Sequence, residues 1–115
     1  MPAYALARLR RPAEFHPEVG RYLAGIQRTL DPFGGRFVVH GAEVEVREGS
    51  WDGDLVVIEF DDLVSARSWY ESEAYQQILP LRTRHLAGDV ILVDGVGRDH
   101  DSAAMAGALG AGATA

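Results

Sequence analysis

Residues 55–60 read Leu-Val-Val-Ile-Glu-Phe, and residues 90–93 read Val-Ile-Leu-Val. Successive side chains of a β-strand point to opposite faces of its sheet. In the first run, one face is therefore wholly apolar and the other carries a single charge, Glu59; in the second run both faces are apolar. Phe37-Val38-Val39 repeats the pattern. These runs predict strands of a sheet with apolar side chains on both surfaces.

Two amphipathic segments separate the predicted strands. The first begins near Pro17, which is tolerated in a first helical turn, and carries one apolar stripe at helical spacing, formed by Val19, Tyr22, Leu23, Ile26 and Leu30. The second begins at Asp61 or Asp62, either of which can cap a helix. Within it we expect Ser72 to interrupt or re-cap the helix and Pro80 to kink it or end a turn.

Strands over residues 4–9, 36–46, 55–60 and 90–93 complete the order β-α-β-β-α-β, with a connecting loop at 47–54. This order is the split-βαβ, ferredoxin-like arrangement of the α+β class. Because crossovers are right-handed, it restricts the fold to a four-stranded antiparallel sheet with both helices on one face.

The helix-free face of this sheet predicts a partner. Such a face is normally polar, but here it is apolar, and leaving it wet would expose a patch on the order of several hundred square ångströms. A second copy, packed face to face with the helices outward, would bury it, so we predict a homodimer of two-fold symmetry. The alternative, a C-terminal tail folded over the sheet, offers only Met105 and Leu109 as bulky side chains.

The composition excludes several classes of function. The chain has 115 residues, enough for one domain, and its 11 Lys and Arg against 17 Asp and Glu give a net charge of −6, which argues against general nucleic-acid binding. It has no Cys, which excludes disulfides, thiolate nucleophiles and Cys-ligated metals. No apolar run is long enough to span a bilayer and the N-terminus lacks the apolar region of a signal peptide, so we expect a cytoplasmic protein with no membrane partner.

The C-terminal residues differ from the rest of the chain. Residues 103–115 read AAMAGALGAGATA, with no charge and too little bulk for a core. We expect one folded domain over residues 1–96 and a flexible Ala- and Gly-rich tail over 97–115, part of which could form a helix if a partner surface exists.

Specific motifs add a family resemblance. GGRFVVHGAEVEVREGSW (34–51), VVIEF (56–60), ARSWYESEAYQQI (66–78), Arg82 and ILVDG (91–95) occur in the order and at the separations typical of the domain-of-unknown-function family 1330. The chain resembles this family, whose superfamily fold is the dimeric α/β barrel. The resemblance implies architecture but no reaction, because the superfamily includes cofactor-independent monooxygenases, muconolactone-type isomerases, haem-degrading enzymes, polyketide cyclases and non-catalytic proteins. Family members often carry Arg where this chain has His40, and a basic residue near Leu55, so an anion contact at those positions is not carried over.

Two polar residues on predicted strands are candidate catalytic groups. Burial of Glu59 between two sheets would raise its pKa and suit it to general acid or base catalysis. Alternatively, Glu59 fixes the interface by pairing with an arginine, the candidates being Arg8, Arg36 and Arg82. His40 precedes Gly41, where a strand can bulge, and could move a proton near neutral pH, or it could be a core or edge histidine with a satisfied hydrogen bond.

Candidate substrate-binding residues are Trp51, Trp69, Tyr70, Tyr75 and Arg82. Trp51 lies in a loop, where it either fills a hole or stacks on a planar ligand. Trp69 and Tyr70 occupy adjacent helical positions, so at least one ring faces the sheet and the other can line a pocket; core packing is the alternative for Tyr70 and Tyr75. Arg82 could bind a carboxylate through two hydrogen bonds, or pair with an acidic residue, either Glu73 or Asp94.

We expect no cofactor and no metal. Asp99-His100-Asp101 lacks a second pair of ligands at a structured spacing, and Gly34-Gly35 ends a helix instead of opening one, which argues against a phosphate loop. His16 and His85 are interpreted as surface or capping groups.

Two functions remain open. The first is a cofactor-independent enzyme, monooxygenase-, isomerase- or cyclase-like, that acts on a small planar organic acid or polyketide-like substrate, with His40 or Glu59 moving a proton. The second is a non-catalytic dimeric module that binds a small ligand or a partner protein.

Overall fold

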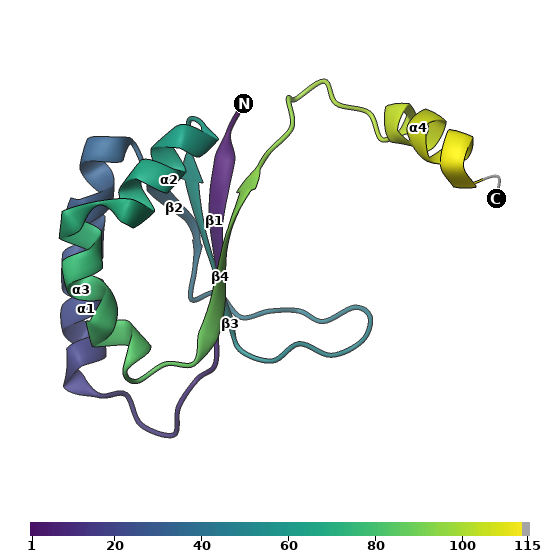
Figure 1. Ribbon diagram of the computed structural model, residues 1–115. Coiled ribbons are helices and arrows are strands. Elements are labelled where there is room, and N and C mark those ends of the chain that lie inside the picture. Colours follow the sequence, from purple (N-terminus) through teal and green to yellow (C-terminus); the bar gives the residue numbers. More distant parts are fainter. Residues whose placement is uncertain (114–115) are drawn as a thin grey trace.

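The computed structural model describes residues 1–113 and has two layers, a sheet and the helices that cover one of its faces (Figure 1). The strands are β1 (Ala3–Leu9), β2 (Arg36–His40), β3 (Asp54–Phe60) and β4 (Gly88–Asp94). The helices are α1 (Pro17–Leu30), with a 3₁₀ turn at Asp31–Phe33, α2 (Leu63–Glu71), α3 (Glu73–Thr83) and α4 (Ala103–Ala113). The predicted ferredoxin-like α+β order is confirmed over β1 to β4.

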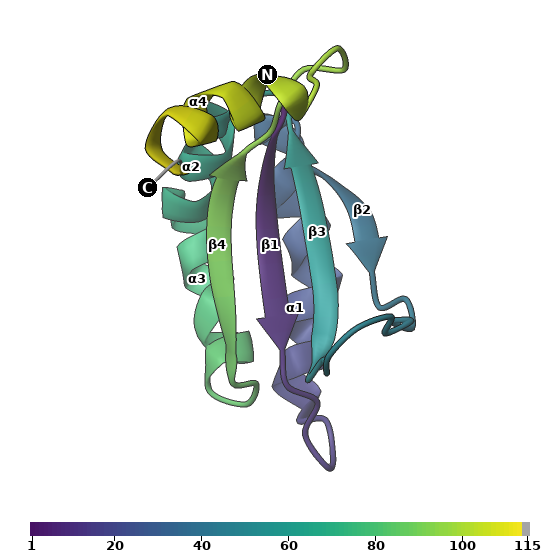
Figure 2. The ribbon, with the colours of Figure 1, turned by 90° about the vertical axis from the view of Figure 1, so that its right-hand side faces the viewer.

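The sheet is antiparallel throughout, in the order β2-β3-β1-β4 (Figure 2). Leu6 of β1 pairs with Val57 on one side and Ile91 on the other, so these residues share a surface. We call this surface, opposite α1–α3, the open face; it carries Tyr4, Leu6, Val57, Glu59, Ile91 and Val93. Ile91 is 55% exposed and Val93 42%. Apolar side chains therefore do occupy both surfaces of the sheet.

The helix ends follow from short-range hydrogen bonds. His16 caps α1 because its Nδ1 accepts from the backbone N–H of Glu18 at 3.1 Å. Ser72 separates α2 from α3 and caps α3, its Oγ accepting from Tyr75 N–H at 3.2 Å, as predicted. Pro80 does not end a turn, because α3 continues through it to Thr83.

The predicted strand over residues 36–46 is too long. β2 ends at His40, and Gly41 adopts a left-handed φ of 82° that turns the chain out of the sheet. The following residues form a long loop that projects from the sheet on the side away from α1 and α3 (Figure 1). Val44 and Val46 continue the alternating pattern in sequence but have no strand to pair with.

The core lies between α1–α3 and the sheet and includes Ile26, Leu30, Phe60, Trp69 and Tyr75. The indole N–H of Trp69 donates to Thr29 Oγ1 at 3.0 Å, so the polar atom of this buried ring is satisfied. In contrast, β1 carries alanines at alternate positions on this face, Ala3, Ala5 and Ala7. Small side chains on a central strand leave space beneath the helices.

The segment after β4 includes α4, which stands on the open-face side of the sheet (Figure 1). Met105 and Leu109 of α4 are exposed. Among the residues that the structure describes, no helix combines the length and the apolar character needed to cross a bilayer.

Candidate functional site

Two adjoining cavities lie beneath the helices. The inner cavity, of about 50 Å³, is walled by α1, α3 and the small residues of β1, Ala5 and Ala7. The outer cavity, of about 160 Å³, extends toward exposed Arg10 and Arg11. They share six lining residues: Leu9, Tyr22, Leu23, His40, Val56 and Arg82. Almost all the remaining wall of the inner cavity is aliphatic or aromatic.

Arg82 is the polar centre of these cavities. Its side chain comes from the last turn of α3 and is 5% exposed. In the described chain no carboxylate lies within 4.0 Å of its guanidinium, and neither Glu73 nor Asp94 pairs with it. Its guanidinium interacts with the side chains of Tyr22 and Tyr75, and its Cζ lies 5.5 Å from the centre of the Tyr22 ring.

The two tyrosines form a buried pair. Their hydroxyl oxygens are 2.7 Å apart, and burial, followed by the neighbouring Tyr75, raises the pKa of Tyr22 well above its ordinary value. Burial alone would lower the pKa of Arg82, but the adjacent tyrosine hydroxyls raise it above its usual value. The group is therefore a permanent cation held among two neutral hydroxyls and apolar walls.

His40 stands at the edge of both cavities. A bulge in β2 between Phe37 and Val39 shifts the alternation, so that Phe37 and His40 pair with Ile58 and Val56 on the helix-covered face. The two rings stack with their centres 4.1 Å apart, and His40 remains exposed to solvent. The bulge is thus what brings an exposed imidazole to the cavity wall.

Glu59 lies on the opposite surface. It accepts from the Tyr4 hydroxyl at 3.1 Å and from the Arg36 guanidinium on the open face. In the single chain, the hydrogen bond from Arg36, more than that from Tyr4, lowers the pKa of Glu59. The reason is that Arg36 reaches the carboxylate across the β2–β3 ladder, where it pairs directly with Glu59. The structure does not bring Glu59 and His40 together.

The aromatic candidates divide between the two surfaces. Trp51 is 44% exposed, its indole N–H donates to Gly53 O at 3.0 Å, and it borders a shallow depression on the open face beside Leu6 and Ile91. Trp69 and Tyr75 line the inner cavity. Tyr70 packs edge-on against Trp69, with ring centres 6.1 Å apart, and does not line either cavity.

Sequence reasoning missed Tyr22 as a site residue. It belongs to the apolar stripe of α1, where a tyrosine looks like any core residue. The available signal was its hydroxyl, which needs a partner when buried.

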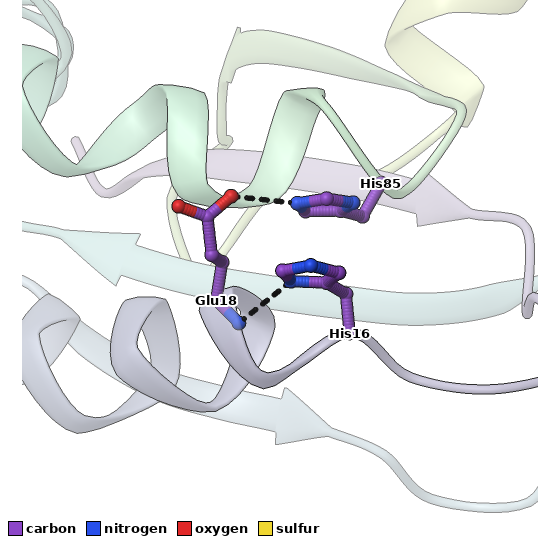
Figure 3. A group of neighbouring side chains, drawn as sticks. All are labelled: His16, Glu18 and His85. Carbon is purple, nitrogen blue, oxygen red and sulfur yellow. Dashed lines mark hydrogen bonds and ion pairs between the residues drawn. The ribbon is translucent and has the colours of Figure 1, made fainter.

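A second cluster joins the start of α1 to the end of α3 (Figure 3). His85 Nε2 donates to Glu18 Oε1 at 2.7 Å, while Arg21 and Arg84 donate to Glu18 Oε2. His16 stacks on His85 with ring centres 3.8 Å apart and planes 5° from parallel. The hydrogen bond from His85 makes the largest contribution to lowering the pKa of Glu18.

This cluster is the set of described residues best placed to hold a metal, with ligand atoms within 4.8 Å of one another. Its geometry does not suit one. Metal–nitrogen bonds of about 2.1 Å lie in the imidazole plane, and two nearly parallel rings whose centres are 3.8 Å apart cannot share an ion without ring rotation. Arg21 and Arg84 also place positive charge at the carboxylate. The arrangement is that of a hydrogen-bonded clamp between two helix ends.

Comparisons with known proteins identify a family and a fold. The family model described as a domain of unknown function (DUF1330) matches residues 2–96. No curated protein matches the chain.

Solved structures with the same fold differ widely in sequence. A protein of unknown function from Rhodopseudomonas palustris is 15% identical with a TM-score of 0.60, over 84% of this chain and 83% of that one. A dimeric ferredoxin-like protein of unknown function from Thermobifida fusca is 17% identical with a TM-score of 0.54, over 83% and 92%. A variant of SnoaB, a cofactor-independent oxygenase from Streptomyces nogalater, is 13% identical with a TM-score of 0.50, over 86% and 95%. At these identities, the likeness concerns the fold alone.

Proposed function

The chain belongs to the DUF1330 family, and from this premise we propose that it is a homodimeric protein that binds a small planar organic acid in the two cavities beneath its helices. Family membership implies the fold but no reaction, so the evidence for a function must come from the residues of the site.

The observation that carries it is the buried Arg82, which has no carboxylate partner among the described residues. Removing a guanidinium from water is unfavourable unless an anion or several hydrogen bonds compensate it. Tyr22 and Tyr75 supply only neutral oxygens, and no carboxylate of the described chain reaches the group. A ligand carboxylate would supply the missing charge, and the planar guanidinium can bind both of its oxygens.

The walls define the rest of the ligand. Ile26, Ile58 and Trp69 present apolar or aromatic surface to the inner cavity, and the outer cavity supplies further volume. Sites for small molecules typically combine such walls with a few convergent polar groups. The size favours a single ring or a short chain over a fused polycyclic substrate.

For catalysis, we propose that His40 moves the proton. A neutral imidazole at the cavity edge can take a proton from an acidic carbon of the bound acid and return it at another position, which is the balance of an isomerase- or cyclase-like reaction. The resulting enolate would supply the reactivity without a cofactor, and a monooxygenase-like reaction would need molecular oxygen as co-reactant. Glu59, on the open face, is left out of this step. The alternative, a non-catalytic binding module, uses the same cavity without the proton transfer.

The open face supports the homodimer. Its exposed Ile91 and Val93 form an apolar surface, and the projecting loop and α4 stand on the same side of the sheet (Figures 1 and 2). Several proteins of similar fold, the one from Thermobifida fusca among them, are described as dimeric.

Binding of benzoate and of neutral benzamide, measured by calorimetry, tests the ligand class. We expect benzoate to bind at least about tenfold more tightly, and Arg82→Gln to abolish this preference. Arg67→Gln, at an exposed arginine of α2, is the matched control and should bind like the wild type. Equal affinity for the two compounds would refute an anion site at Arg82. Retained turnover of a substrate by His40→Ala would instead remove only the catalytic part of the proposal.

A further inference from the structure

We propose that His16, Glu18 and His85 form a proton-sensitive latch that regulates the affinity of the helix-covered cavities for their acid ligand. The inference rests on the proposed function, because it concerns the regulation of the same site.

The latch is built into the cavity wall. Each of its members is adjacent in sequence to a residue that lines the outer cavity: His16 follows Phe15, Glu18 precedes Val19, and His85 precedes Leu86. The backbone N–H groups of His85 and Leu86 both donate to Arg82 O, at 3.0 and 2.9 Å. A change at the latch therefore reaches the turn that carries the anion-binding guanidinium.

The same contact reaches the other side of the cavity. Glu18 lies one helical turn before Tyr22, on the first turns of α1. The His85–Glu18 hydrogen bond thus links the start of α1, which supplies Tyr22, to the end of α3, which supplies Arg82. The two bonded residues are 67 positions apart in the chain.

The two imidazoles respond to protons in opposite ways. His85 donates to Glu18 either as a neutral ring or as a cation, so protonation strengthens its bond. His16 accepts from the backbone N–H of Glu18 through Nδ1, and a protonated ring has no acceptor. Protonation of His16 therefore removes the cap, places a positive charge at the positive end of the α1 dipole, and sets it 3.8 Å from the His85 ring.

The surrounding charges do not relieve this effect. The charged groups that face the cluster are Arg21 on α1, Arg84 at the end of α3, and Glu18 itself. The Glu18 carboxylate already accepts hydrogen bonds from both guanidiniums. Acidification is thus expected to loosen the first turn of α1 and, with it, the wall formed by Val19 and Tyr22. Ligand affinity should therefore be lower at acidic pH than at neutral pH.

Benzoate affinity measured at about pH 7.5 and about pH 5.5 tests the latch, because benzoate stays ionised over this range. We expect the wild type to lose about fivefold in affinity at the lower pH, the equivalent of one lost N-cap. His16→Asn keeps a capping acceptor that cannot titrate, so it should bind nearly equally at both. His100→Asn, at an exposed histidine outside the cluster, is the control and should keep the wild-type response.

His85 has its own test at the higher pH. His85→Ala should weaken benzoate binding severalfold, and His85→Gln, which can still donate to Glu18, should restore it. An unchanged pH response in His16→Asn, or wild-type affinity in His85→Ala, would overturn the latch.

A ligand-free readout separates failure of the latch from failure of the binding site. If benzoate does not bind wild type at either pH, the proposed function fails, whereas the latch is still judged by amide hydrogen exchange of residues 18–22. Their protection factors should fall on acidification in the wild type and not in His16→Asn, and equal behaviour of the two proteins would rule the latch out.

Discussion

Arg82 is the single buried charged residue in the part of the chain that the structure describes, and its type matters. A lysine in this position could lose its proton on burial, whereas a guanidinium stays charged and presents a planar fork. Arg82 also stands over the Tyr22 ring, which a compact ammonium would cover poorly. The residue type therefore points to recognition of a planar anion.

The sequence could suggest Arg82 as a carboxylate binder but not decide between a ligand and an internal partner. That choice depends on where Glu73 and Asp94 lie after folding, and neither pairs with it. Tyr22 was not predicted as a site residue for a related reason, because its role depends on Tyr75, 53 residues away in the chain. Spacing along one helix carries no information about such a contact.

Removal of the Tyr75 hydroxyl tests the buried pair. Tyr75→Phe removes the hydrogen bond between the two buried hydroxyls, which we expect to lower the free energy of unfolding by about 1–2 kcal/mol and to weaken benzoate binding. Urea unfolding and calorimetry measure the two effects. Tyr70→Phe, the matched change at a ring outside both cavities, should leave both values almost unchanged. A Tyr75→Phe protein as stable as the Tyr70→Phe protein would show that the hydroxyl pair contributes nothing.

At the scale of elements, two irregularities of the sheet create the site. The alanines of β1 leave room under α1 and α3, and the bulge in β2 turns His40 to the same surface as Phe37. Hydrophobic alternation predicted the strands and their two apolar surfaces well, because it is a local property. Alternation also predicted that β2 continues to residue 46, which is wrong, because a sequence pattern cannot show whether a partner strand is present.

The close contact at the start of β2 gives a prediction about packing. A Cβ on Gly35 would lie 2.6 Å from the Phe60 ring and 2.8 Å from Leu30 Cδ2, closer than packed atoms allow. We expect Gly35→Ala to destabilise the fold by about 1–3 kcal/mol, because both neighbours belong to the core.

Gly20 provides the control for this substitution. A Cβ there meets nothing within 4 Å, and the residue lies inside α1. Gly20→Ala should therefore stabilise the protein by up to about 1 kcal/mol. Thermal or urea unfolding should show changes in stability of opposite sign for the two variants. Changes of the same sign would contradict the explanation that Phe60 and Leu30 leave no room for a side chain at Gly35.

On the scale of the whole molecule, the two surfaces of the sheet carry different sets of the predicted site residues. The helix-covered surface holds Arg82, Tyr75, Trp69 and His40, all predicted from the sequence as site residues. Glu59 and Trp51, predicted with them, lie on the open face. The sequence could not separate the two groups, because the β2 bulge and the path of the long loop determine which surface each residue reaches.

Glu59 should accordingly affect assembly and not ligand binding. Its pKa is lowered in the folded chain, so its favourable contribution is complete above the ordinary carboxyl pKa and is lost as the pH falls through the lower folded value. Glu59→Gln removes the charge that Arg36 and Tyr4 hold on the open face. We expect a weaker dimer by analytical ultracentrifugation and unchanged benzoate affinity; the reverse result would return Glu59 to the binding site.

The most direct test of the assembly is a charge at the centre of the open face. Ile91 pairs with Leu6 of β1, is 55% exposed, and would lie against the partner's sheet if two copies pack face to face. Ile91→Asp would bury a carboxylate in an apolar interface, so we expect a folded monomer at micromolar concentration by size-exclusion chromatography with light scattering. Val64→Asp, at a 67% exposed position of α2 on the other side of the molecule, should remain dimeric. A wild-type protein that is already monomeric, or an Ile91→Asp protein that still forms dimers, would mean that something other than a second copy covers this surface.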